Sequence, residues 1–180
     1  MTSRIKSLVE AFGLGAIVAV IATVAIIGPR PSLGSSPSEV VMNLIERRCK
    51  PMIRFGLPLN RSGLESVYSN KFEQQILLDP NNNVALRSGK KDGKYYCTIS
   101  NFEENWLSNE VELIERAIQE SWMEWVNEEA EFRDLSSSSL GKLHLYRPLD
   151  GEGRFFLLGH AETKSGLYTT ITVGEAKFSD

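Results

Sequence analysis

The chain has 180 residues, of which 42% are hydrophobic and 24% are charged, and its formal net charge is −3 at pH 7. This length allows one domain with a substantial core and excludes two ordinary domains beside a targeting segment. The slightly negative charge excludes a global positive field of the kind that attracts nucleic acid, so we expect no nucleic-acid partner.

The first predicted element is an apolar run, Ala11–Ile27, that contains no charged residue. Arg4 and Lys6 precede it, and the Gly-Pro-Arg-Pro sequence at 28–31 ends it. Two interpretations are open: an uncleaved membrane anchor over residues 1–28, or a signal segment that is removed after export to the periplasm. In both cases the positive residues keep the N-terminus in the cytoplasm, so the rest of the chain is expected on the extracytoplasmic side.

Small side chains recur at every fourth position of this run, at Ala11, Gly15, Ala19 and Thr23. On a helix they form one face, which lets a second membrane helix approach closely. The pattern predicts an anchor that packs against another membrane helix. The alternative is that the spacing only reflects the alanine and glycine content of targeting segments.

A linker over residues 29–35 leads into a single domain over residues 36–180. The sequence Ser36-Pro37-Ser38-Glu39 is typical of a helix start, because serine caps, proline fits the first position and glutamate reaches back to the cap amide. The helix that follows has one apolar face, made by Val41, Leu44, Ile45 and Cys49. We therefore expect Cys49 to point into the core.

Two short strands are predicted at Val84–Arg87 and Lys94–Ser100, on either side of a charged turn. The period of two places Cys97 on the more apolar face of the second strand. In an oxidising compartment Cys49 and Cys97 are expected to form a disulfide between the first helix and the sheet. The residues before these strands are ambiguous, and a short helix around Leu64–Phe72 is one interpretation.

The longest helical pattern covers Asn109–Arg133, with an apolar stripe on one side and glutamates opposite. The stripe consists of Val111, Ile114, Ile118, Trp122 or Ser121, Trp125 and Phe132. Residues 101–134 hold eleven acidic and two basic residues, a local charge of −9. The pattern predicts a core helix with a solvated acidic side. The functional alternative is an acidic docking face for a basic partner at Glu120, Glu124 and Glu128.

Three further strands are predicted at Lys142–Arg147, Arg154–Glu162 and Leu167–Val173, separated by glycine-containing turns. The predicted element order is α-β-β-α-β-β-β. This order favours an α+β fold, in which a curved antiparallel sheet of about five strands packs on one long amphipathic helix.

The chain contains no specific catalytic motif, and we expect no catalytic residues and no cofactor. His144 and His160 are weak metal candidates, because one hairpin register places them opposite each other with Glu162 on the same face. A shift of one residue removes that pairing, and no ligand spacing supports a zinc site. We therefore expect no metal.

Two classes of function follow from these patterns. The first is a non-enzymatic accessory protein, membrane-anchored or exported, that contacts another envelope or membrane protein on the trans side of the membrane. The second is a small-ligand-binding module or small enzyme whose pocket lies between the aromatic helix and the sheet. The candidate lining residues of that pocket are Trp122, Trp125, Tyr95 and Tyr168.

Overall fold

The structure is a computed structural model that describes residues 36–69, 74–102, 106–126, 130–136, 141–148, 152–164 and 166–178. The expected anchor or signal over residues 1–28 and the linker over 29–35 lie outside these ranges. The expected helix-packing face lies outside them too; it comprises Ala11, Gly15, Ala19 and Thr23. Within the described ranges, no helix combines the length and apolarity that crossing a membrane requires.

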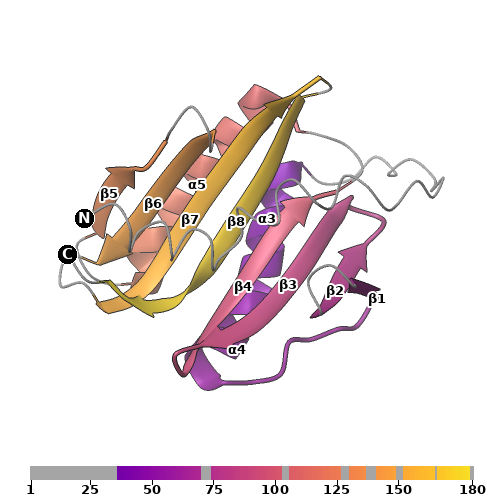
Figure 1. Ribbon diagram of the computed structural model, residues 1–180. Coiled ribbons are helices and arrows are strands. Elements are labelled where there is room, and N and C mark those ends of the chain that lie inside the picture. Colours follow the sequence, from indigo (N-terminus) through magenta and orange to yellow (C-terminus); the bar gives the residue numbers. More distant parts are fainter. Residues whose placement is uncertain are drawn as a thin grey trace.

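The described strands form one antiparallel sheet of eight strands, in the spatial order β1-β2-β3-β4-β8-β7-β6-β5 (Figure 1). β4 and β8 pair at the centre of the sheet, and β1 and β5 form its edges. The strands are β1 (Glu65–Ser69), β2 (Gln74–Asp79), β3 (Val84–Lys91), β4 (Lys94–Asn101), β5 (Ala130–Asp134), β6 (Lys142–Pro148), β7 (Glu152–Thr163) and β8 (Gly166–Lys177).

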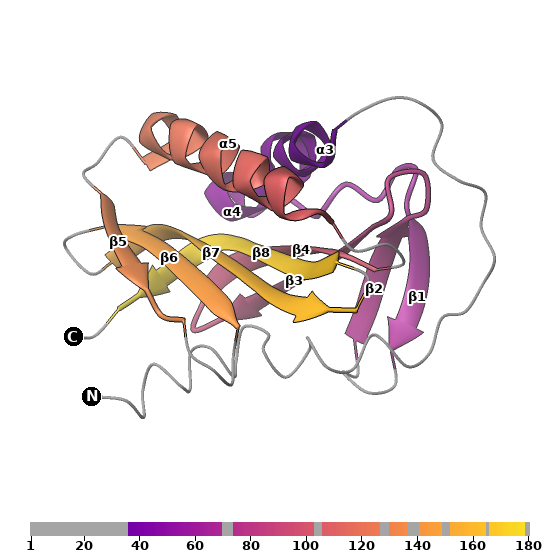
Figure 2. The ribbon, with the colours of Figure 1, turned by 90° about the horizontal axis from the view of Figure 1, so that it is seen from above.

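The described helices are α3 (Pro37–Leu44), η2 (Ile45–Cys49), α4 (Lys50–Phe55) and α5 (Ser108–Val126). The first three follow one another without a break. Ser36 caps α3 as expected, since its hydroxyl accepts from the Glu39 backbone N–H and the Glu39 carboxylate accepts from the Ser36 N–H. Gly56 ends α4 with a left-handed φ of 65°. All these helices lie on one face of the sheet (Figure 2).

The fold consists of two successive halves, each a helical element followed by four antiparallel strands. α3 to α4 precede β1–β4, and α5 precedes β5–β8. The halves meet where β4 pairs with β8, and Thr98 lies opposite Thr172 near the middle of that pairing. α3 and α5 pack against each other above this junction.

The predicted fold class is therefore wrong in its strand number and element order. The sheet has eight strands rather than five, and the order is α-β-β-β-β-α-β-β-β-β. The long helix is also shorter than predicted, because α5 begins at Ser108 and ends at Val126.

Pairing at the two sheet edges explains these differences. Residues 130–134 form β5, in which Phe132 lies opposite Tyr146 of β6, so this phenylalanine belongs to the sheet and not to the helical stripe. At the other edge β1 occupies the region where a short helix was one interpretation. β1 is exposed, so it lacks the buried apolar alternation that marks a strand in sequence.

The core lies between the sheet and the helices. α5 contributes Val111, Ile114 and Ile118, which are buried as the apolar stripe predicted. The side of the sheet that faces these helices is called the helix face. Ile99, Phe156 and Ile171, from the central strands, are buried on this face. Nothing is described of the Trp122 and Trp125 side chains.

The disulfide between Cys49 and Cys97 is confirmed. It joins η2 to β4, with Cα atoms 5.6 Å apart, and both cysteines are fully buried. The described residues contain no free cysteine. The bond ties the first helical element to β4, the strand of the first half that lies at the centre of the sheet.

Replacing both cysteines, as Cys49→Ala with Cys97→Ala, should lower the free energy of unfolding by up to about 4 kcal/mol, because the bond closes a loop with a sequence separation of 48. Urea denaturation measures the loss. Reductant should destabilise the wild type and leave the double variant unchanged. Alkylated thiols in non-reduced protein from its native compartment would contradict the bond.

Ile114→Ala should destabilise the domain by about 2–5 kcal/mol, because this fully buried side chain would leave a cavity between α5 and the sheet. Glu120→Lys, on the exposed side of the same helix, should change stability by only about 0–1 kcal/mol. Urea denaturation compares the two variants. Equal losses would mean that α5 does not pack on the sheet through this stripe.

Candidate functional site

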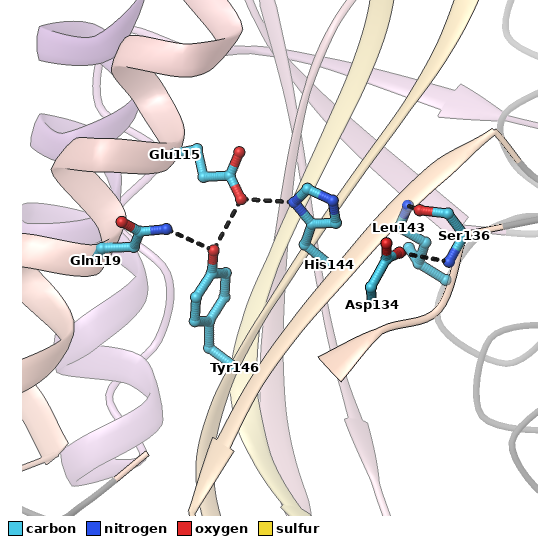
Figure 3. Close-up of polar contacts among 7 residues, drawn as sticks. All are labelled: Glu115, Gln119, Asp134, Ser136, Leu143, His144 and Tyr146. Atoms are coloured by element: carbon cyan, nitrogen blue, oxygen red, sulfur yellow. Dashed lines mark hydrogen bonds and ion pairs between the residues drawn. The ribbon is translucent and has the colours of Figure 1, made fainter. Parts of the chain in front are cut away.

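A polar cluster joins α5 to β6 on the helix face of the sheet (Figure 3). Glu115 and Gln119 are four residues apart on α5 and therefore share one side of the helix. His144 and Tyr146 are two residues apart on β6 and therefore share one face of the strand. We refer to Glu115, Gln119, His144 and Tyr146 as the polar cluster.

The Glu115 carboxylate is the centre of the polar cluster. Its Oε1 accepts a hydrogen bond of 2.8 Å from the Tyr146 hydroxyl and lies 2.5 Å from His144 Nδ1. The Tyr146 oxygen in turn accepts a 2.7 Å hydrogen bond from Gln119 Nε2. The side chains of Glu115 and His144 are each about one-fifth exposed, and Tyr146 is buried. The cluster is therefore shielded from water on one side and reachable from the other.

The surroundings of Tyr146 keep its hydroxyl protonated. Burial raises the pKa of Tyr146 from its ordinary value of 10.0 to about 12. The hydrogen bond from Gln119 lowers this pKa, whereas the hydrogen bond to the Glu115 carboxylate and the charge of that group raise it. The phenol is thus held as a hydrogen-bond donor and is poorly suited to act as a base near neutral pH.

An exposed aromatic side chain lies beside the polar cluster. Phe132 on β5 packs edge-on to His144, with ring centroids 5.3 Å apart, and against Tyr146 at 5.2 Å. More than half of Phe132 (52%) is exposed. The site therefore combines an accessible apolar ring with a half-buried acid and imidazole.

Backbone contacts hold the strand that carries Phe132. The Ser136 N–H donates to Asp134 Oδ1 at 2.9 Å, and the Leu143 N–H donates to Ser136 Oγ at 3.0 Å (Figure 3). The hydrogen bonds from Ser136 lower the pKa of the exposed Asp134 carboxyl. These contacts connect the end of β5 to the start of β6.

The predicted register of the two histidines is wrong. His144 lies opposite Leu158, and His160 lies opposite Lys142, so the imidazoles are diagonal neighbours on one face. The observed pairing differs from the predicted one by two residues, which preserves the face but separates the rings. Within the described ranges no group of three His, Cys, Asp or Glu residues is placed to hold a metal ion.

His160 differs from His144 in its surroundings. Burial, together with the nearby Lys142 and His144, lowers the pKa of His160. Its Nδ1 atom is buried without a hydrogen-bond partner, whereas His144 contacts Glu115. His160 is therefore an uncharged neighbour of the polar cluster near neutral pH.

The structure places only some of the other predicted site residues. Glu120 is exposed on α5, nothing is described of the Glu124 side chain, and Glu128 lies outside the described residues. The strand register places Tyr95 on the helix face and Tyr168 on the opposite face. These two tyrosines therefore do not line one pocket.

Sequence reasoning missed the polar cluster itself. The helical pattern predicted the glutamates on the side of α5 opposite the apolar stripe, but Glu115 points toward the sheet. The spacing of Glu115 and Gln119 and the alternation of His144 and Tyr146 each indicate a shared side. Only the packing of α5 over β6 brings the two pairs together.

Comparison of the chain with protein-family models, curated proteins and solved structures finds no match.

The raised pKa of Tyr146 predicts a pH dependence of stability. The folded state favours the neutral phenol, so its contribution is complete below about pH 10, and it is lost as the pH rises through about 12. Urea denaturation across this range should show a steeper loss for the wild type than for Tyr146→Phe. Tyr68→Phe, which removes an exposed phenol, serves as the control and should behave as the wild type. Identical slopes for all three proteins would contradict the raised pKa.

Proposed function

We propose that this chain is a non-enzymatic accessory protein that binds another envelope or membrane protein on the extracytoplasmic side of a membrane. The buried disulfide between Cys49 and Cys97 is the observation that best supports an extracytoplasmic location. Disulfides of this kind persist in oxidising compartments and are rare in the cytosol. The basic N-terminal residues and the apolar run support the same direction of export.

The outward side of α5 is the proposed docking surface. We define the outer face of α5 as Asn109, Glu112, Leu113, Arg116 and Glu120, all of them exposed. Leu113, with 46% of its surface exposed, lies among charged neighbours. An apolar anchor surrounded by charge resembles the core and rim of a protein interface. The glutamates favour a partner with a basic surface.

The polar cluster supports a second candidate function, the binding of a small ligand. Phe132 offers an exposed ring that packs against His144, and Glu115 and His144 offer a partly exposed acceptor and imidazole. Binding sites commonly pair an apolar wall with a few fixed polar groups. We rank this function second, because the cluster satisfies its own hydrogen bonds.

Affinity capture from solubilised membranes distinguishes the two functions. The double variant Glu112→Lys with Glu120→Lys should recover less partner than the wild type, because the charge reversal removes the attraction to a basic surface. Added salt should weaken capture by the wild type. Glu65→Lys, one such charge reversal at an exposed position of β1, should capture as the wild type does.

Equal recovery of the same partners by the wild type and the double variant, at both low and high salt, would contradict docking through α5. Capture that survives the double variant but is lost in Phe132→Ala would move the docking surface from α5 to the polar cluster.

A further inference from the structure

The sheet has a second face, opposite α3, α4 and α5. The strand register assigns alternate residues to it, and the large apolar ones from the second half of the sheet are buried. We define the second face by Leu143, Leu145, Phe155, Leu157 and Tyr168. All the described helices lie on the other side of the sheet (Figure 2).

The side chains of the second face form a continuous layer. Glycines on neighbouring strands make room for them: a Cβ atom at position 174 would come within 3.0 Å of the Phe155 ring, and one at position 159 within 3.1 Å of Leu143 Cδ1. Phe178 packs edge-on to Phe155, with ring centroids 5.7 Å apart. This layer belongs to a packed interior rather than to a surface in water.

Polar groups on this side of the sheet are buried too. The hydroxyls of Thr98 and Thr172 lie 3.1 Å apart in a hydrogen bond, and both residues are almost completely buried. Arg147 is buried with its guanidinium 5.4 Å from the centre of the Phe178 ring. Burial also lowers the pKa of Arg87, which pairs with Thr98 on the same side. Water is therefore excluded from the second face as well as from the helix face.

An uncovered second face would be costly. Each aromatic ring alone buries roughly 150–250 Å², and the largest apolar patch on a typical monomer is only about 300–600 Å².

We propose that the N-terminal apolar run, Ala11–Ile27, binds the second face of its own domain. Of the stretches outside the described residues, residues 1–35 are the longest, and the others contain at most four residues each. The run offers 17 consecutive uncharged residues, which match the apolar layer. No other undescribed stretch is long enough to cover five large side chains from three strands.

The linker is long enough for this contact. Residues 28–35 connect the run to α3, which lies on the helix face. Eight extended residues reach about 26 Å, more than twice the roughly 10 Å between packed layers. The run can therefore pass around the sheet to the opposite side.

This inference goes beyond the proposed function. The same run cannot lie in a bilayer and on the second face at once, so membrane insertion competes with the intramolecular contact. Insertion would leave the second face open to a different occupant. Docking through α5 is independent of this exchange, since α5 lies on the opposite side of the sheet.

Photo-cross-linking of the full chain in detergent-free buffer tests the contact. With p-benzoylphenylalanine in place of Leu157, peptide mapping should find a bond to residues 11–27 within a single chain. The same probe in place of Leu113, on the outer face of α5, should not reach that run. A bond from position 157 to a second chain would overturn the proposal in favour of a dimer, and the absence of any bond to residues 11–27 would also overturn it.

A second measurement leaves the sheet unaltered. Val20→Arg should weaken the contact, so hydrogen exchange in β6 and β7 and binding of an apolar dye should both rise. Ser32→Arg, the same change within the linker, should leave both readouts at the wild-type level. An unchanged Val20→Arg protein would overturn the proposal. Neither readout depends on partner capture, so the proposed function can fail while this contact holds.

Discussion

The pairing of β4 with β8 is the contact on which the rest of the structure depends. It joins two four-stranded halves, and the two paired strands are separated along the chain by α5 and three other strands. The pairing closes a long loop, so it has an entropic cost that only extensive burial offsets. That burial is present, because Ile99 and Ile171 lie opposite each other and are both fully buried.

The position of α5 follows from this junction. Once β8 lies beside β4, the helices of the two halves share one face and pack against each other. α5 then lies across the strands of its own half, and its inner side reaches β6. The polar cluster is therefore a product of tertiary packing. Its two residues on α5 are about one helical turn apart, and its two residues on β6 are two positions apart on the same face of the strand.

The two faces of the sheet differ in what covers them. The disulfide fixes the first helical element over the helix face, where Cys49 meets Cys97. The second face is as well buried as the helix face, although all the described helices lie on the other side of the sheet. A strand that is buried on both sides of a sheet has consecutive hydrophobic residues in its sequence, as β7 has over Phe155–Leu158. This continuity distinguishes β7 from a strand with one solvated face.

Local patterns in the sequence were enough to determine some features of this protein. The capping residues at Ser36 and Glu39, the buried stripe of α5 and the inward direction of both cysteines follow from short-range spacing. Tertiary structure alone decided the edge strands β1 and β5, the register of His144 and His160, and the inward turn of Glu115. The physical reason is that edge pairing, hairpin register and helix–sheet contact depend on residues far apart in the chain, which local periodicity does not encode.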